Sequence, residues 1–345
     1  MLTIKTITAL SATVLILSIC TATEAISVVP LTGTTSLREE AHKKNITIGS
    51  GAINPTYLKD PVFAAVLALQ FNSLHPENEM KWDFIHPTEG HYNWEPIDRL
   101  VQFAENHDML VKGHGLISNC CNPGYVLNIT NPVVFRAAMT THFKAILHRY
   151  EGRIDRWDVV TEPFLTMGGG LANNDFYKRL GPGYIDDAFR IARAVSPNAK
   201  LYINEALVES IPVKRQELYS LVSGLVANGS PIDGVALQMH ITEIAPTPGV
   251  LTEIVHSYKA LGLQVEIAEM DVHTLNSTLQ TQIYGAVIRE ALEAGTTDIN
   301  FWGFTDKHSY TWLPGAKPLM FDENYRPKGA FYATHSALED FTDSC

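Results

Sequence analysis

Short apolar runs alternate with helical patterns along most of this chain. Eight runs have the length and composition of buried β-strands, at residues 46–53, 70–75, 109–117, 154–160, 200–204, 234–240, 264–272 and 299–304. Between them, apolar residues recur at helical spacing, as in 61–71, 96–107, 135–150 and 184–195. Strands that alternate with helices at intervals of roughly 35 residues predict a parallel sheet. Eight such units predict a single α/β domain folded as a closed (β/α)8 TIM barrel.

The predicted barrel indicates where the chemistry should lie, because active sites of such barrels form at the carboxyl ends of the strands. Polar or aromatic side chains lie in the later part of nearly every predicted strand or just after it: Glu77, Asn78, Lys81, His114, Glu162, Gln238, His240, Glu269, Asp271, Trp302 and Asp306. Solubility alone does not require such a ring at one face. The pattern therefore predicts a binding or catalytic site at the mouth of the barrel.

Two glutamates in this ring suit the cleavage of a glycosidic bond. The reaction needs one carboxylic acid to protonate the leaving oxygen and a second carboxylate to meet the positively charged sugar carbon. Glu162 ends the apolar run WDVVTE (157–162), and Glu269 lies within the seventh predicted strand. Strands four and seven of an eight-stranded barrel face each other across the mouth. We therefore expect the two carboxylates to share one cavity, about 5–5.5 Å apart as in retaining enzymes.

Eight motifs occur in order along the chain: ENEMKW (77–82), GHGL (113–116), WDVVTE (157–162), LYINEA (201–206), LQMH (237–240), IAEMDV (267–272), FWGFTDKHS (301–309) and PLMFDENYRPKGAFYA (318–333). Together they resemble glycoside hydrolase family 10, the family that includes the endo-β-1,4-xylanases. The likeness covers essentially the whole chain after residue 25. It implies a retaining β-glycosidase with no metal or organic cofactor, because a pair of carboxylates carries the reaction.

The resemblance also implies a role for each matching residue. Glu162 would be the acid/base and Glu269 the nucleophile. Residues that support these two carboxylates would be Gln238, His240, Asp271 and Thr161. Residues that contact the sugar would be Glu77, Asn78, Lys81, His114, Asn204, Trp302, Tyr310 and Trp312, where Tyr310 and Trp312 are alternatives for one tryptophan of the family.

The chain departs from the family pattern at the sugar pocket. Ser118 and Asn119 replace a Trp-His pair, Thr161 replaces an asparagine before the acid/base, and Ala206 replaces an aromatic residue. The loss of polar and aromatic sugar contacts favours a bulkier, partly apolar ligand. We therefore expect a reaction like that of the secreted fungal tomatinases, which resemble this family and remove the oligosaccharide from the steroidal saponin α-tomatine.

Two alternatives stay open. The close second is an endo-1,4-β-xylanase that degrades plant cell-wall xylan. The third is an inactive barrel that binds carbohydrate, although the presence of both Glu162 and Glu269 argues against it. In each case the partner is a plant-derived β-linked oligosaccharide, glycoside or saponin, and we expect a monomer.

The N-terminus has the pattern of a secretory signal peptide. Lys5 precedes the apolar run 8–19, and the small-residue sequence TATEA (21–25) predicts cleavage after Ala25. The catalytic domain would then span residues 26–345. The apolar run is too short to span a bilayer comfortably, so we expect an extracellular protein with no membrane anchor. Four sequons, at Asn45, Asn128, Asn228 and Asn276, fit a secreted glycoprotein.

Few cysteines remain after cleavage of the signal: Cys120, Cys121 and Cys345. A vicinal bridge between Cys120 and Cys121, a link from either to Cys345, and free thiols all stay open. The cysteine and histidine spacing argues against a zinc site. The net charge of -11 and the lack of Lys/Arg clusters argue against nucleic acid as a partner.

Overall fold

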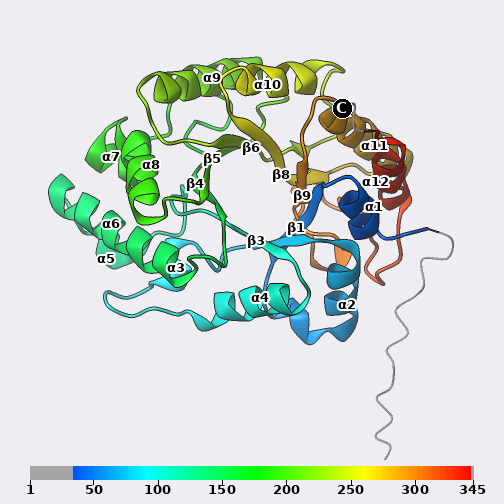
Figure 1. Ribbon diagram of the computed structural model, residues 1–345. Coiled ribbons are helices and arrows are strands. Elements are labelled where there is room, and N and C mark those ends of the chain that lie inside the picture. The colour runs from blue at the N-terminus through cyan, green and yellow to red at the C-terminus, as the bar shows by residue number, and fades with distance from the viewer. Residues whose placement is uncertain (1–33, 343–345) are drawn as a thin grey trace, which may run out of the picture.

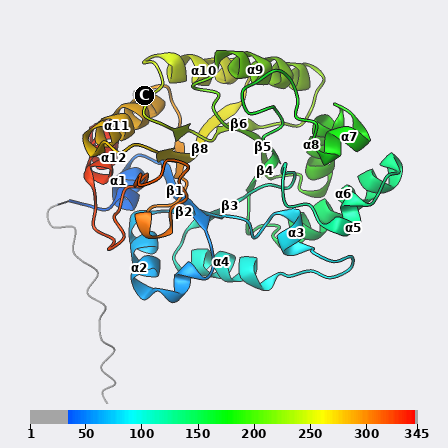
Figure 2. The same cartoon turned by 180° about the vertical axis from the view of Figure 1, so that it is seen from behind.

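Parallel strands close into a barrel that is ringed by helices (Figures 1 and 2). The structure, a computed structural model, describes residues 34–342. Its strands are β1 (Thr47–Ile53), β2 (Ser73–Pro76), β3 (Leu110–Gly113), β4 (Arg156–Thr161), β5 (Lys200–Glu205), β6 (Gly234–Leu237), β7 (His240–Ile241), β8 (Gln264–Val272) and β9 (Asp298–Phe301). Pairing of β6 with β8 closes the ring, and β7 continues β6 after two residues. The predicted eight-stranded barrel is therefore confirmed.

Helices cover the outside of the barrel, and four of the longer ones correspond to the four helical stretches named from the apolar spacing. Longer helices are α2 (Pro61–Gln70), α4 (Glu95–Asn106), α6 (Pro132–Arg149), α8 (Tyr184–Val195), α9 (Pro212–Ala227), α10 (Val250–Lys259), α11 (Ser277–Glu293) and α12 (Gly329–Asp340). Shorter ones are α1 (Leu37–Lys43), η1 (Tyr57–Lys59), α3 (Trp82–Ile85), α5 (Gly124–Leu127), α7 (Asp175–Leu180) and η2 (Asp306–His308). Two of the longer helices, α2 and α6, begin at a proline behind a cap, Asp60 and Asn131 respectively, because proline needs no amide donor in the first turn.

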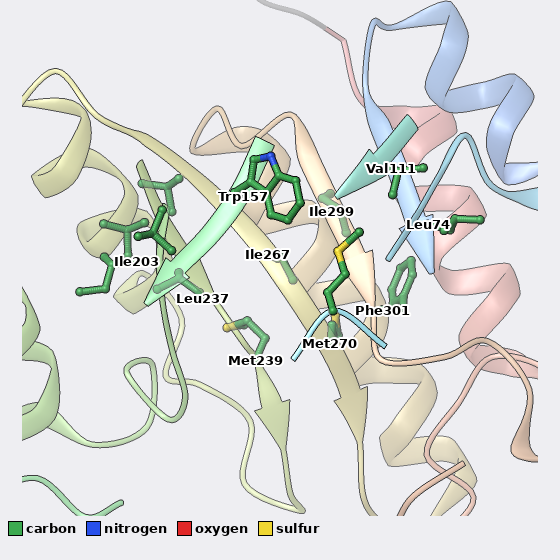
Figure 3. Close-up of a cluster of buried hydrophobic side chains, with 14 of the residues drawn as sticks. Leu74, Val111, Trp157, Ile203, Leu237, Met239, Ile267, Met270, Ile299 and Phe301 are labelled. Carbon is green, nitrogen blue, oxygen red and sulfur yellow. The ribbon is translucent and has the colours of Figure 1, made fainter. Parts of the chain in front are cut away.

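The main apolar core lies between the barrel strands and this layer of helices. Alternate strand residues point outward into it, and Figure 3 shows Leu74, Val111, Trp157, Ile203, Leu237 and Ile299 among them. Successive side chains of a strand point to opposite faces of the sheet. The intervening residues of the same strands therefore point into the barrel.

The inside of the barrel is largely polar and carries buried charges. Lys112 of β3 is fully buried, and its Nζ lies 3.0 Å from Oδ1 of Asp158 on β4 and contacts Glu266 of β8. Arg156 of β4 pairs with Asp298 of β9 and donates to Ser73 Oγ at 2.7 Å. Burial opposes the charge on Lys112, but the two carboxylates outweigh it and raise the pKa of the amine above its ordinary value. Opposite charges thus compensate one another within the barrel.

Four of the predicted strands are shorter than expected by two residues or more. The strand predicted at 70–75 starts at Ser73, because α2 continues to Gln70. The strands predicted to end at 117 and 304 end at Gly113 and Phe301. The strand predicted at 234–240 breaks at Met239, whose φ is 65°. Three of these early ends lie at the carboxyl ends of the strands, where the chain turns polar side chains toward the mouth.

Some predictions concern residues outside the described range. The signal peptide, its cleavage after Ala25, Cys20 and Cys345 all fall there. The four sequon asparagines are described and all are exposed, so glycosylation stays a prediction. Between residues 34 and 342, no helix combines the length and the apolar composition needed to cross a membrane.

Candidate active site

A cavity of about 240 Å³ opens at the carboxyl ends of the strands. Residues from six of the eight barrel strands or the loops that follow them line it: Lys81, His114, Ser118, Asn119, Cys120, Thr161, Glu162, Gln238, His240, Glu269, Trp302, Tyr310 and Trp312. Ten of these residues are predicted site residues. The two predicted catalytic glutamates therefore lie on the same cavity.

Glu162 directly follows β4, and several contacts fix its unusual backbone. Its φ is 54°, a left-handed conformation that a residue with a Cβ rarely adopts. The amide of Glu162 donates to the carbonyl of Asn204 at 2.9 Å, and the side chain of Asn119 donates to the carbonyl of Glu162. These contacts explain how a strand with a dry outer face delivers a carboxylate into the mouth.

Glu269 lies inside β8 and is almost completely buried. Its Oε1 accepts a hydrogen bond from Asn204 Nδ2 at 2.8 Å, and its Oε2 lies 3.4 Å from His240 Nε2. Burial disfavours ionisation of this carboxyl group. The hydrogen bond from His240 and the nearby imidazole of His114 outweigh that effect and hold the pKa of Glu269 well below its usual range. The carboxylate is therefore ionised and oriented, as a nucleophile must be.

Two amide side chains bridge the pair of carboxylates. Gln238 Nε2 donates to Glu162 Oε1 at 3.0 Å and to Asn204 Oδ1 at 2.9 Å. Asn204 Nδ2 then donates to Glu269 and, at 3.1 Å, to Oδ2 of Asp158. The chain of contacts runs from one glutamate to the other through two residues. This bridge sets the distance and the relative orientation of the two carboxylates.

A second set of contacts orients the histidines beside Glu269. His240 Nδ1 lies 2.9 Å from Asp271 Oδ1, and His114 Nδ1 lies 2.9 Å from Asp158 Oδ2. Burial disfavours a charge on His240, but Asp271 and Glu269 outweigh it and raise the pKa of the imidazole well above its ordinary value. A protonated His240 can therefore hold Glu269 in its ionised form.

Comparison with known proteins adds a second line of observation. The model of glycosyl hydrolase family 10 matches residues 36–337, which is most of the chain. The chain belongs to this family. It is thus a glycosidase of the retaining type that works with catalytic glutamates, and the predicted enzyme class is confirmed.

Known xylanases and their solved structures are similar to this chain over most of its length. Endo-1,4-β-xylanase B of Thermotoga neapolitana is 34% identical over 320 residues, which cover 88% of this chain and 92% of the relative. Endo-1,4-β-xylanase 3 of Hypocrea jecorina is 34% identical over 277 residues, covering 80% and 78%. The crystal structure of xylanase 10B from Thermotoga maritima has a TM-score of 0.84 at 37% identity, covering 88% of this chain and 98% of the other.

Seven of the eight residues predicted to contact sugar fall into two groups. Lys81, His114, Trp302, Tyr310 and Trp312 line the cavity. Glu77 and Asn78 follow β2 outside the lining, and Asn78 Oδ1 accepts a hydrogen bond from Lys81 Nζ at 2.9 Å. Asn78 therefore positions a cavity residue.

Asn204 differs from its predicted role as a sugar contact. It is fully buried below the cavity, and both of its amide atoms are used by Gln238, Asp158 and Glu269. Asn204 therefore supports the two glutamates. Asp271 is also buried and does not line the cavity. Its Oδ1 lies 2.9 Å from His240 Nδ1, a position that is compatible with its predicted supporting role. Asp306 lies outside the site and pairs with Lys328 Nζ at 2.8 Å.

Sequence reasoning missed several residues of the site. Asp158 holds both His114 and Asn204, and alternation along β4 could have placed it inside the barrel with Arg156. The sequence places Asn119 at the sugar pocket but misses its contact with the carbonyl of Glu162, because no local pattern signals a contact across 43 residues. His273 lies beyond the predicted motif and contacts Asp271.

Cys120 lines the cavity, and Cys121 follows it with a left-handed φ of 64°. Both are free thiols in the structure, which is one of the alternatives left open by the sequence. Burial, with the neighbouring Cys120, raises the pKa of the Cys121 thiol to about 11. That thiol is therefore a poor nucleophile at neutral pH.

Two groups of three side chains bring potential metal ligands close together: His114, Asp158 and Glu269, and His240, Asp271 and His273. In the first group the histidine and Asp158 are hydrogen-bonded, and Glu269 is held by Asn204. In the second, Asp271 accepts from His240. These side chains are therefore already held in contacts with one another or with Asn204.

A larger cavity of about 510 Å³ lies at the opposite end of the barrel. Residues at or next to the starts of the strands line it, including Thr47, Leu110, Lys200, Gln264 and Asp298. It contains neither candidate glutamate. We assign the active site to the smaller cavity, because its chemistry and its position in the barrel agree.

Glu205 gives a pH-dependent prediction for stability. It is fully buried at the end of β5, where it pairs with Lys214 at 2.8 Å and accepts from the amide of Phe164. Burial raises the pKa of Glu205 to about 7, despite Lys214. The folded state therefore binds more protons than the unfolded state between about pH 4.5 and 7, so the free energy of unfolding falls as the pH rises through this window.

We expect that loss to reach about 3 kcal/mol by pH 8, and Glu205→Gln to remove most of it. Chemical denaturation of both proteins at pH 5 and pH 8 measures the difference. Parallel pH dependence in the wild type and the variant would contradict the prediction.

Thr161 gives a prediction that separates stability from activity. Thr161 lines the cavity, and its buried Oγ1 has no hydrogen-bond partner among residues 34–342. Such an atom costs roughly 1–3 kcal/mol in the free protein, whereas a bound sugar hydroxyl can satisfy it. Thr161→Val should therefore raise the melting temperature and lower kcat/KM about tenfold. Unchanged kcat/KM would show that the hydroxyl does not contact the substrate.

Proposed function

We propose that the protein is an endo-1,4-β-xylanase that hydrolyses internal bonds of xylan with retention of configuration. The observation that carries the proposal is the bridge through Gln238 and Asn204, which holds Glu162 and Glu269 on one cavity. Relatives named as endo-1,4-β-xylanases support the choice of substrate. The similar xylanase 10B from Thermotoga petrophila, 36% identical with a TM-score of 0.84, has been solved in complex with xylobiose.

In this proposal the two glutamates have different catalytic roles. Glu162 protonates the leaving oxygen while Glu269 attacks the anomeric carbon, which gives a covalent glycosyl-enzyme. Glu162 then takes a proton from water, and the attack of that water releases the sugar. His240 and Asn204 hold Glu269 in place through both steps. Trp302 and Trp312 offer apolar faces to the sugar rings.

One structural observation favours a second candidate, a saponin glycosidase that acts on α-tomatine. The mouth lacks the family's aromatic residues at positions 118 and 206, which are Ser and Ala. Ile244, which follows β7 at the carboxyl end of the barrel, is 81% exposed. An exposed aliphatic side chain on this face suits an apolar steroid better than a polar xylan chain.

Parallel assays test the two candidates. The purified protein is incubated with xylan and with α-tomatine, and the released sugars are separated and quantified. The proposal predicts xylo-oligosaccharides of mixed length from xylan, with the β configuration retained by NMR. Release of the oligosaccharide from α-tomatine with no product from xylan would overturn the first candidate and support the second.

We also propose that the protein is secreted and glycosylated. The pattern of residues 5–25 supports export, and the exposure of Asn45, Asn128, Asn228 and Asn276 supports modification. Expression with its own N-terminus in a eukaryotic host tests both. The medium should contain a protein that begins after Ala25 and loses mass on deglycosylation.

A further inference from the structure

His273 follows β8, just beyond the strand that carries Glu269, and is completely buried. Its ring stacks on the ring of Trp312, with centroids 3.6 Å apart and planes 23° from parallel. Trp312 lines the sugar cavity but is 44% exposed and belongs to the loop between η2 and α12. The stack therefore fixes the orientation of a ring that the solvent would otherwise leave free to rotate.

Both nitrogens of His273 lie close to polar atoms, although only Nδ1 has the geometry of a hydrogen bond. Nδ1 lies 3.0 Å from Thr311 Oγ1, which belongs to the same loop as Trp312. Nε2 lies 3.0 Å from Asp271 Oδ1, the same oxygen that contacts His240 Nδ1 at 2.9 Å. One carboxylate oxygen thus joins the histidine that contacts Glu269 to the histidine that supports the aromatic loop.

The use of histidine at this position is informative. A phenyl ring would stack on Trp312 equally well, but it would leave Asp271 and Thr311 without their contacts. An asparagine could replace a polar contact, but it would leave the face of Trp312 unsupported. The imidazole makes both kinds of contact at once, and it does so between the sugar-facing loop and the support of the nucleophile.

We infer that His273 is a positioning residue that couples the sugar-facing ring of Trp312 to the nucleophile Glu269, through Asp271 and His240. Stacking of a sugar on Trp312 then tightens the same network that orients Glu269 for attack. The inference rests on the proposed roles of Glu269 and of the cavity. It adds to them a path by which substrate binding and the first chemical step depend on each other.

Two substitutions separate the two contacts. H273F keeps the stack and loses the polar partners, so we expect kcat to fall about tenfold with KM nearly unchanged. H273N keeps a polar side chain and loses the stack, so we expect KM to rise about fivefold with kcat nearly unchanged. T311V removes the contact between Thr311 Oγ1 and the ring of His273, so it should raise KM, as H273N does.

The experiment measures kcat and KM of each variant on p-nitrophenyl β-xylobioside. The matched controls are H335F and H335N, which change another buried histidine, on α12 outside the barrel, and should leave both constants at wild-type values. In a W312A background, H273N should have no further effect on KM, because the two changes remove one contact. T311V keeps the test valid if a variant at position 273 does not fold.

The outcomes are distinct. A KM effect in H273N, a kcat effect in H273F and non-additivity with W312A support the inference. Equal effects of H273F and H273N, wild-type constants in both, or full additivity with W312A overturn it. If the wild type itself does not cleave the xylobioside, the proposed substrate fails, and the same variants are then compared by the release of sugar from α-tomatine.

Discussion

Replacing Glu269 with alanine should lower turnover on xylan by on the order of 10⁴-fold or more. Without this carboxylate no covalent glycosyl-enzyme can form, and His240 and Asn204 lose the side chain that they hold in place. Added azide should then enter the vacated space and attack the anomeric carbon in a single displacement. We therefore expect an α-linked glycosyl azide, identified by NMR, and a partial return of turnover.

The matched control for this variant is Glu243→Ala, since Glu243 is an exposed glutamate of the loop after β7 that lies outside the cavity lining. It should keep wild-type kinetics. Thermal unfolding of both variants checks that the loss of activity does not come from unfolding. Residual turnover within tenfold of the wild type in Glu269→Ala would rule out this residue as the nucleophile.

Glu162→Gln should show a loss that depends on the leaving group. Glutamine can still accept the hydrogen bond from Gln238, so the geometry persists while the transferable proton is gone. For a poor leaving group such as a xylose hydroxyl, we expect kcat/KM to fall about 10²–10⁴-fold. For a dinitrophenyl xylobioside, which leaves without protonation, kcat/KM should stay within a few-fold of the wild type.

Azide serves as a second readout for Glu162→Gln. An anion needs no general base, so it should accelerate breakdown of the glycosyl-enzyme and give a β-linked glycosyl azide. The opposite anomers expected from the two variants distinguish the two roles. An equal loss of kcat/KM with both leaving groups would contradict the assignment of Glu162 as the acid.

Much of the catalytic centre can be predicted from local signals. WDVVTE places a carboxylate at the end of a strand with a dry outer face, and IAEMDV places one within another strand. The order of the strands in the barrel then brings both glutamates to one mouth. The side chain of Glu162 still depends on a left-handed backbone that its own sequence does not announce, since glutamate has no preference for positive φ.

The supports of these glutamates could not be predicted in the same way. The resemblance predicts that Asn204 contacts sugar, yet Asn204 is fully buried and bonded to Gln238, which follows the adjacent strand β6, and to Glu269 of β8, which is not adjacent to its own strand β5. The strand breaks at Met239, and this break turns Gln238 and His240 toward the cavity. In the sequence, however, the alternation of apolar and polar residues continues through this position. Apolar periodicity reports which face of a strand is buried, but not where its ladder of hydrogen bonds stops.

Alternation, helical spacing and motifs are properties of neighbouring residues, so they are enough to predict the barrel, the family and the two candidate glutamates. Which side chains meet across the barrel depends on the tertiary fold. Asn204 reaches Glu269 across 65 residues, and Lys112 reaches Glu266 across 154. Trp312 rests on His273, and Asn119 holds Glu162. Such contacts depend on closure of the barrel, which fixes distances between segments that no local pattern relates.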